Sequence, residues 1–170
     1  TFKGMVMFLK KIIIVTFLIE GIGAVILSLR FIPDYGFIGG VFRGIFHSIT
    51  AFCNAGFDIL GNNSLMDYST DYIINITIMI LIILGGLGFT VLIDIGKYIK
   101  YKIYKLLNKK VELFVMSVHS KLAITITCIL IILGALLTFI IEYKNPETLL
   151  PLRFDQKILV SVFESVTLRT

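Results

Sequence analysis

The stretch GIFHSITAFCNAGFD, residues 44–58, decides the fold of this chain. It is too short and too polar to cross a membrane, yet it lies between two apolar runs that are long enough to do so. It begins as a helix-like segment and breaks at CNAGFD, residues 53–58. A short helix followed by a glycine-containing turn, held between two spanning helices, predicts backbone that enters the bilayer to meet an ion.

The composition of the chain is typical of an integral membrane protein. Of its 170 residues, 57% are hydrophobic, and the mean hydropathy is +0.96. Runs 12–29, 73–93 and 122–141 each approach the roughly 20 apolar residues that cross a bilayer core. A soluble helical domain would need polar faces on these runs, and they have almost none. The sequence therefore predicts an all-α integral membrane protein.

Other classes of protein find little support. No cleavable signal pattern precedes the first run, and we expect the chain to be an internal fragment of a longer protein. Cys53 and Cys128 have no CxxC or Cys/His spacing, so neither a disulfide framework nor a zinc site is supported. We expect no enzyme activity, no cofactor in this chain and no metal beyond a transported ion, because no acid, base or metal-ligand set is clustered. Nothing except lysine content suggests nucleic-acid binding.

The charges are distributed asymmetrically along the chain. Seven lysines, opposed by Glu112 alone, separate the second run from the third: Lys97, Lys100, Lys102, Lys105, Lys109, Lys110 and Lys121. The positive-inside rule predicts that the N-terminus and 97–121 are cytoplasmic, and that 30–71 (including 58–71, which has no basic residue) and 143–157 are extracytoplasmic. This topology is consistent only if 39–58 enters the membrane from outside and returns there.

The expected elements follow in order. We predict a first span at 12–29, an external connection at 30–40, a short helix at 41–52 and a second span at 72–95. An amphipathic surface helix is the competing interpretation of 41–52, although such helices usually carry more lysine and arginine. Glu20, within the first span, is either a carboxylate near an ion path or a hydrogen-bonded packing group.

Two segments after the turn have open interpretations. The glycines of LGGLGF, residues 84–89, allow either direct packing of another element on the helix backbone, which we favour, or a kink. The lysine-rich segment 97–121 either docks a soluble subunit or anionic lipid, or only enforces orientation.

The turn itself has the chemistry of an ion filter. A short helix that enters from outside directs its negative dipole end towards the turn, and Gly56 is free to adopt conformations that aim a carbonyl inward. Carbonyl rings of this kind replace an ion's hydration shell. Asp58 at the outer lip would concentrate cations, with Thr50 and Cys53 at the adjoining pore helix and mouth. His47 is interpreted as a packed pore-helix residue rather than a catalytic one.

The chain contains an internal repeat. Lys10, Thr16, Gly23 and Ala24 recur as Lys121, Thr127, Gly134 and Ala135, 111 residues later. IFHSIT at 45–50 matches VFESVT at 162–167 with an offset of 117, which aligns Cys53 with Thr170. We therefore predict one complete span–pore helix–span unit at 1–100, a basic cytoplasmic linker at 101–120, and a second unit at 121–170 that stops before its filter.

Three motifs resemble a known family. AFCNAGFD at 51–58, LGGLGF at 84–89 and SVFESVTLRT at 161–170 resemble the membrane subunit of the Ktr/Trk/HKT potassium transporters, most closely the KtrB type. The resemblance covers essentially the whole chain, as a second repeat and part of a third. It implies four potassium-channel-like units around one pathway, so that this chain is a fragment of a four-repeat pore.

The resemblance also implies roles and partners. Asn54, Ala55, Gly56 and Phe57 match one filter segment, with Gly56 as its glycine, and Thr170 matches the first position of the next. The implied partners are the remaining repeats, a second membrane subunit, the lipid bilayer, and a cytosolic regulatory ring that alone would bind nucleotide. The expected function is potassium uptake across the plasma membrane. The alternatives are a scaffolding membrane subunit and a related transporter that passes sodium.

Overall fold

The structure, a computed structural model, describes residues 2–61, 63–107 and 113–169, and in these ranges all regular structure is helical. The elements are α1 (Phe2–Phe52), the 3-10 helix η1 (Ser64–Tyr68), α2 (Tyr72–Leu87), α3 (Phe89–Leu106), α4 (Val118–Glu142) and α5 (Phe154–Leu168). The expected all-α fold is confirmed. α1 and α4 are each long and apolar enough to cross a membrane, and α2 with α3 forms a third candidate span that is bent.

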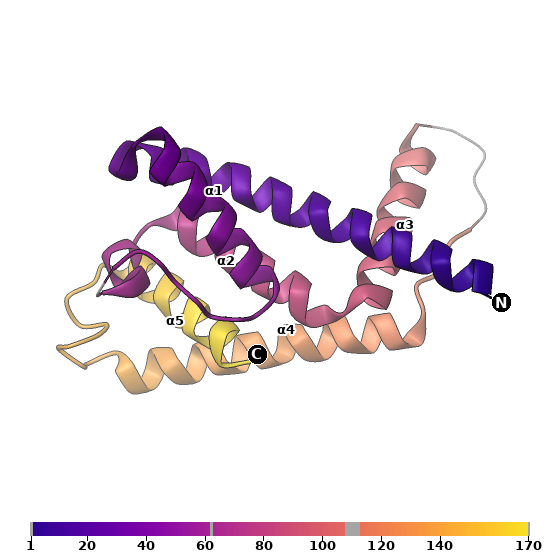
Figure 1. The fold of residues 1–170 in the computed structure, drawn as a ribbon. Coiled ribbons are helices and arrows are strands. Elements are labelled where there is room, and N and C mark those ends of the chain that lie inside the picture. The colour runs from indigo at the N-terminus through magenta and orange to yellow at the C-terminus, as the bar shows by residue number, and fades with distance from the viewer. Residues whose placement is uncertain (1, 62, 108–112, 170) are drawn as a thin grey trace.

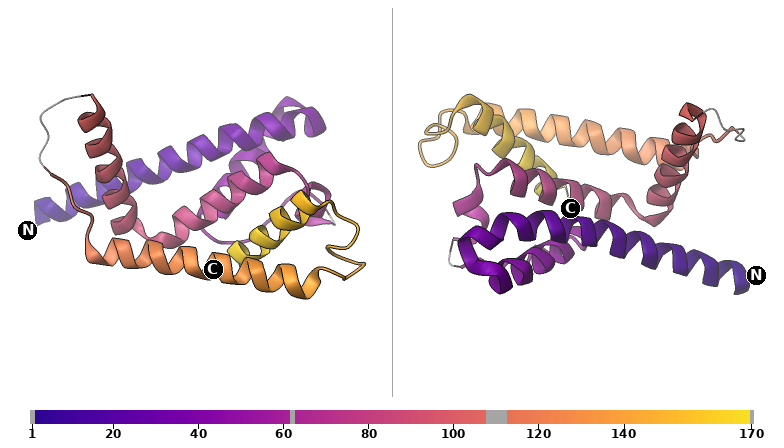
Figure 2. Two further views of the ribbon diagram at one scale, coloured as in Figure 1. Left: turned by 180° about the vertical axis from the view of Figure 1, so that it is seen from behind. Right: turned by 90° about the horizontal axis from the view of Figure 1, so that it is seen from above.

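The long helices lie roughly side by side and give the molecule two distinct ends (Figure 1). The N-terminus and α3 lie at one end. The connections that contain η1 and residues 143–153 lie at the other, and the views in Figure 2 agree. The two ends therefore contain the segments that the charge pattern assigns to opposite sides of a membrane.

α1 consists of two helical arms that meet at Gly36. This residue alone has a non-helical conformation, with φ 71° and ψ 172°, so the chain reverses within one residue. The expected connection at 30–40 is therefore wrong: residues 30–35 continue the first arm and 37–40 begin the second. Packing overrides the turn signals there, because Phe31 is completely buried and Arg30 bonds Asp34 one turn later.

Glycines let the second arm of α1 pack on the first. A Cβ at Gly40 would overlap the backbone of Ile32, and one at Gly44 would overlap Ser28. The four-residue spacing of these two glycines puts both on one face of the short arm, the arrangement that allows close helix approach in membranes. The hairpin is thus held by backbone contact.

An ionic cluster fixes the hairpin to α2. Arg30 donates to Asp71 over 2.5 Å, and the other oxygen of Asp71 caps α2 by accepting from Ile74 N at 3.0 Å. Tyr68, in η1, donates its hydroxyl to Asp34 over 2.9 Å. The end of the first span is therefore tied to the start of the second on the side of the connecting loops.

α2 combines the two behaviours considered for LGGLGF. At Gly85 a Cβ would overlap the carbonyl oxygen of Phe52, so the second arm of α1 packs directly on the backbone of α2. At Gly88, with φ 85°, the helix ends, and α3 departs at 110°. The favoured packing is confirmed, and so is the kink. The expected span at 72–95 is therefore bent, because Gly88 redirects the chain before residue 95.

The following elements differ in length from expectation. α3 continues to Leu106, so the first part of the expected linker at 101–120 is helical, and 108–112 lie outside the described residues. α4 begins at Val118, where Ser117 caps it, and it contains the expected span 122–141. α5 is the second short helix, at the place where the repeat requires one.

Replacing Gly85 with Ala tests the contact with Phe52. The added methyl group would force the two helices apart, and overpacking of this kind costs about 1–3 kcal/mol. We expect a lower apparent melting temperature for the full-length protein in detergent.

Gly96→Ala is the matched control, since nothing lies within 4 Å of its Cβ position and alanine favours helix. It should leave the melting temperature unchanged or raise it slightly. Equal destabilisation by both substitutions would contradict the proposed importance of the Gly85 contact.

Candidate functional site: the turn at residues 53–58

The second arm of α1 ends in a hydrogen-bonded cap that reverses the chain. Ala55 N donates to Thr50 O at 2.9 Å, and Asn54 N donates to Ala51 O at 3.1 Å. Asn54 has a positive φ of 52°. These two bonds and this conformation define a Schellman cap, in which Asn takes the left-handed position that is usually glycine. Two of the last carbonyls of the arm are thereby satisfied by the turn itself.

The Asn54 side chain attaches the turn to α2. In the amide orientation that satisfies its neighbours, Asn54 donates to Ala51 O at 3.2 Å and Ile82 O at 3.3 Å, and accepts from Gly86 N at 3.3 Å. Ile82 and Gly86 are four residues apart, so these are the two groups that bond each other in a regular helix. The amide therefore contacts both polar groups of one turn of α2, just before the bend at Gly88.

Gly56 has the freest position in the turn. Its φ is 70°, which side chains rarely adopt, and no other atom lies within 4 Å of its Cβ position. Cys53, Ala55 and Gly56 are exposed, and Phe57 is 69% exposed. The structure thus brings the predicted filter residues 54–57 together in one exposed strip of backbone. Thr170, the matching residue of the next unit, lies outside the described residues.

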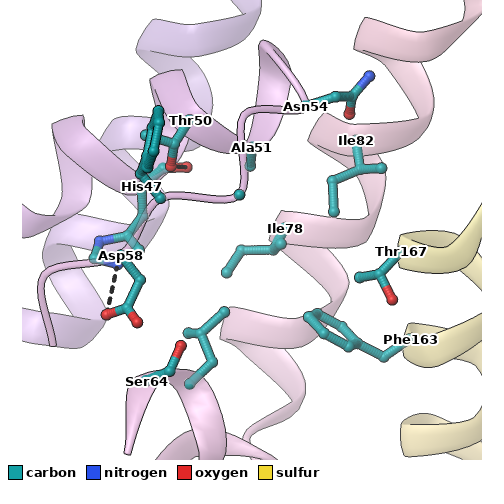
Figure 3. A pocket seen from close by; sticks show the side chains of 13 residues that line it. His47, Thr50, Ala51, Asn54, Asp58, Ser64, Ile78, Ile82, Phe163 and Thr167 are labelled. Atoms are coloured by element: carbon teal, nitrogen blue, oxygen red, sulfur yellow. Dashed lines mark hydrogen bonds and ion pairs between the residues drawn. The ribbon is translucent and has the colours of Figure 1, made fainter. Parts of the chain in front are cut away.

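Asp58 ends the turn, and its side chain lies next to His47 (Figure 3). Its carboxylate accepts from Leu60 N at 2.6 Å and lies 4.0 Å from Nε2 of His47. The Ser64 hydroxyl, followed by the Leu60 amide, lowers the pKa of Asp58. The carboxylate is therefore ionised at neutral pH, and it also organises the loop that follows.

His47 is buried, as expected for a packed residue. Its side chain is 3% exposed, its ring contacts those of Phe31 and Phe46, and Nδ1 lies 2.7 Å from Arg43 O. Within the described part of the chain, Nε2 has no hydrogen-bond partner. Asp58 is the carboxylate that faces it.

A cavity of about 260 Å³ lies between the turn and α5. The second arm of α1 contributes His47 and Thr50, and α5 contributes Phe163 and Thr167 (Figure 3). Thr50 is half-buried and donates its hydroxyl to His47 O at 3.3 Å. The cavity therefore separates the first turn from the short helix of the next expected unit. Among the described residues, no group of three His, Cys, Asp or Glu side chains is placed to hold a metal ion.

Glu20 lies beside the end of the short arm. Its backbone oxygen accepts from the Ser48 hydroxyl at 2.7 Å, and its carboxylate oxygen Oε1 lies 4.0 Å from Sγ of Cys53. Ser48 is also in contact with Gly23, where a Cβ would lie 2.6 Å from its hydroxyl oxygen. The first span therefore holds the short arm through backbone and a glycine.

The same arrangement occurs between α4 and α5. Ser165 donates its hydroxyl to Ile131 O over 2.8 Å, and a Cβ at Gly134 would overlap the Ser165 hydroxyl. These residues follow Ser48, Glu20 and Gly23 by the 117- and 111-residue offsets found in the sequence. We call each serine, with its glycine and carbonyl, a serine clamp.

Sequence analysis did not assign some of these contacts. The repeat aligns Ser48 with Ser165, but the residue type alone does not predict a role for these serines. The Asn54 bridge to α2 had no signal, because neither Ile82 nor the Gly86 amide is distinguished by residue type. The sequence predicts Asp58 as a cation-concentrating charge at the lip of the turn, but it gives no signal for the bond from Leu60 N that organises the following loop.

The fold and turn together define a class of protein. An all-helical chain with membrane-length apolar helices and a short helix that ends in an exposed turn between them has the architecture of an integral membrane protein. Comparison with known sequences identifies the family. Residues 3–170 match the TrkH family, described as cation transport protein, and the chain belongs to this family.

Individual relatives are similar over nearly the whole chain. It is 40% identical over 170 residues to Ktr system potassium uptake protein B of Bacillus subtilis, covering 100% of this chain and 35% of that protein. It is 38% identical over 168 residues to the potassium/sodium uptake protein NtpJ of Enterococcus hirae, covering 99% and 34%. A Ktr system potassium uptake protein B of Vibrio alginolyticus is 34% identical over 161 residues, covering 95% and 33%. The chain spans about a third of the length of these relatives.

Substitutions of Asn54 separate its backbone conformation from its amide contacts. Glycine keeps the left-handed conformation but removes the bridge to α2, and a lost hydrogen bond costs about 1 kcal/mol. Alanine removes the bridge and also makes the conformation costly, by about 1–2 kcal/mol. We expect apparent melting temperatures of the full-length protein to fall in the order wild type, Asn54→Gly, Asn54→Ala.

Two results would contradict this predicted order of melting temperatures. A Gly variant as stable as the wild type would show that the amide bridge contributes nothing. An Ala variant no less stable than the Gly variant would show that the positive φ is not required.

Proposed function

We propose that this chain is part of the membrane subunit of a potassium uptake transporter, in which backbone carbonyls of residues 54–57 form one side of a selectivity filter. The observation that carries the proposal is the exposed turn with positive φ at Asn54 and Gly56, at the end of a short helix between two longer ones. Positive φ at alternate residues changes the orientation of successive peptide planes, which allows their carbonyl oxygens to point towards the same side of the turn. Such carbonyls replace the hydration shell of potassium.

The position of the turn supports a re-entrant path. In Figure 1 the second arm of α1 and α5 both start at the end with the connecting loops and finish about halfway along the long helices. A helix that ends halfway across a bilayer places its partial negative charge where a cation loses water. Asp58, ionised at the outer boundary of the turn, would attract cations from the external solution.

The sidedness follows from the charges. We place the N-terminus and 97–121 in the cytoplasm and 58–71 and 143–157 outside the cell, as the lysines favour. Separation of these segments at opposite ends of the molecule supports this multi-pass arrangement in the plasma membrane.

The two serine clamps support a repeated unit. We propose that 1–100 is one span–pore helix–span unit and that 121–170 begins the next, with four units around one pathway. Under this proposal the residues after Thr170 form the next filter turn, and a glycine is expected within about three positions. The remaining partners that we propose are a second membrane subunit and a cytosolic ring that binds nucleotide. This chain itself is assigned potassium only as cargo, and no enzyme activity.

A sodium-passing transporter is the second candidate. One observation favours it: a relative 38% identical to this chain is named a potassium/sodium uptake protein. Uptake of radioactive sodium by the wild-type protein in the absence of potassium distinguishes the two cargoes. A purely scaffolding subunit, the third candidate, predicts no change in cation transport when the turn is altered.

Gly56→Ser in the full-length protein tests the filter. A side chain at this φ strains the backbone by about 1–3 kcal/mol and displaces the carbonyls from their positions. We expect the selectivity for rubidium over sodium, measured as sodium competition with rubidium uptake, to fall about tenfold, which corresponds to about 1.4 kcal/mol.

Gly61→Ser is the matched control, because Gly61 also has a positive φ, 133°, and an open Cβ position but lies outside the turn. It should leave the selectivity ratio unchanged. An unchanged ratio in Gly56→Ser, at comparable membrane expression, would remove Gly56 from the filter.

A further inference from the structure

We propose that α3 is an interfacial helix that lies on the membrane surface and binds anionic phospholipid headgroups through its lysines. The bend at Gly88 is the first observation. α3 leaves α2 at 110°, and it runs across the direction of α1, α2 and α4 at the end of the molecule that holds the N-terminus (Figures 1 and 2). A helix across the ends of spanning helices lies along the bilayer surface.

The residue pattern of α3 fits this position. One apolar stripe follows helical spacing: Leu92, Ile95, Ile99, Ile103 and Leu106. Its first member is buried, but Ile99 and Ile103 are 51% and 50% exposed, and Leu106 is 85% exposed. The stripe therefore starts inside the protein and continues as an uncovered apolar surface, which is typical of helices that lie in the membrane interface.

The basic residues border this stripe. At 3.6 residues per turn, Lys100 and Lys102 fall on either side of it, Lys105 lies further round the helix, and Lys97 falls on the opposite face. Lys100 lies over the Tyr104 ring at 5.4 Å, and Lys102 over the Tyr98 ring at 5.3 Å. Lysines at these positions extend their charged ends to the headgroup level while their stems cover apolar surface, and tyrosines favour the same depth.

Charge selects anionic lipid as the occupant. The acid within α3, Asp94, already accepts from the hydroxyls of Ser117 and Ser120 at 2.7 and 2.8 Å. Its other oxygen lies 3.9 Å from Nζ of Lys97, so the charges of these two residues offset each other. Lys100, Lys102 and Lys105 have no further acid within α3 to offset them, and Lys100 and Lys102 lie beside the exposed apolar stripe. A continuous apolar stripe bordered by lysines matches the apolar chains and anionic headgroups of a bilayer. A soluble protein partner is one of the outcomes that the experiment distinguishes.

The experiment uses tryptophan quenching, since residues 1–170 contain no Trp. Ile103→Trp and, separately, Tyr101→Trp are introduced into the full-length protein, with tryptophans outside this stretch replaced. The proteins are reconstituted in vesicles containing either brominated phosphatidylglycerol or brominated phosphatidylcholine. We expect strong quenching at 103, on the stripe, and much weaker quenching at 101, on the opposite face. Ile99→Trp replaces the first variant if that one does not fold.

The lysines are tested in the Ile103→Trp background. We expect phosphatidylglycerol to quench more effectively than phosphatidylcholine, and this preference to fall by up to about fivefold for each lysine removed in Lys100→Gln and Lys102→Gln. Added salt should reduce it as well. Lys144→Gln is the matched control, because Lys144 is exposed at the other end of the molecule and should leave the preference unchanged.

Three results would overturn the proposal. Quenching at 103 by aqueous iodide instead of brominated chains would place the stripe in water. Protection from both quenchers would show that protein covers it, as a docked soluble subunit would. Equal quenching by the two lipids, unaffected by the lysine substitutions, would show that the helix lies in the interface without recognising anionic headgroups. Each result is independent of ion selectivity at the turn.

Discussion

The rest of the structure depends on one contact between backbones, the carbonyl of Phe52 against Gly85. A helix leaves its last carbonyls without partners, and within a bilayer no water is present to satisfy them unless protein encloses it. Here the turn supplies two N–H groups to Thr50 and Ala51, and α2 comes close enough to contact the next carbonyl directly. The short helix can therefore end halfway along its neighbours only where α2 has no side chain.

Three glycines at the end of α2 have different roles. Gly85 admits the Phe52 carbonyl, the Gly86 amide meets the Asn54 side chain, and Gly88 ends the helix. At 1.5 Å per residue, the 16 residues of α2 extend about 24 Å, less than the roughly 30 Å of a bilayer core. α3 turns away at 110° and adds little to this length, and its first turn, with Val91 and Leu92 buried, packs against the protein before the lysines begin.

The sequence predicted what depends on residue type and spacing, and it missed what depends on packing partners. Apolar runs located α1 and α4, and the interruption at 53–58 located the turn. For residues 30–40, Pro33 and the nearby glycines predict a connection, whereas burial of Phe31 extends the helix to the single break at Gly36. The bend at Gly88 was one of two possibilities, since several neighbouring glycines are compatible with either packing or a kink. The Asn54 bridge depends on which turn of α2 packs beside residues 53–58, and no single residue type predicts that position.

The serine clamps suggest how a unit of this kind sets the depth of its short helix. Ser48 and Ser165 each donate to a backbone carbonyl of the preceding long helix while resting on a glycine. A backbone carbonyl and a glycine have no side-chain rotamers, so neither can move to accommodate a shifted serine. The short helix can therefore pack on its neighbour in only one register. Since Ser48 lies less than two helical turns before the Asn54 cap, a shift of the short helix at the clamp would displace the turn as well. Recurrence of the clamp where the surrounding residues differ, with Glu20 replaced by Ile131 and His47 by Glu164, argues that geometry, rather than side-chain chemistry, is what the two short helices share.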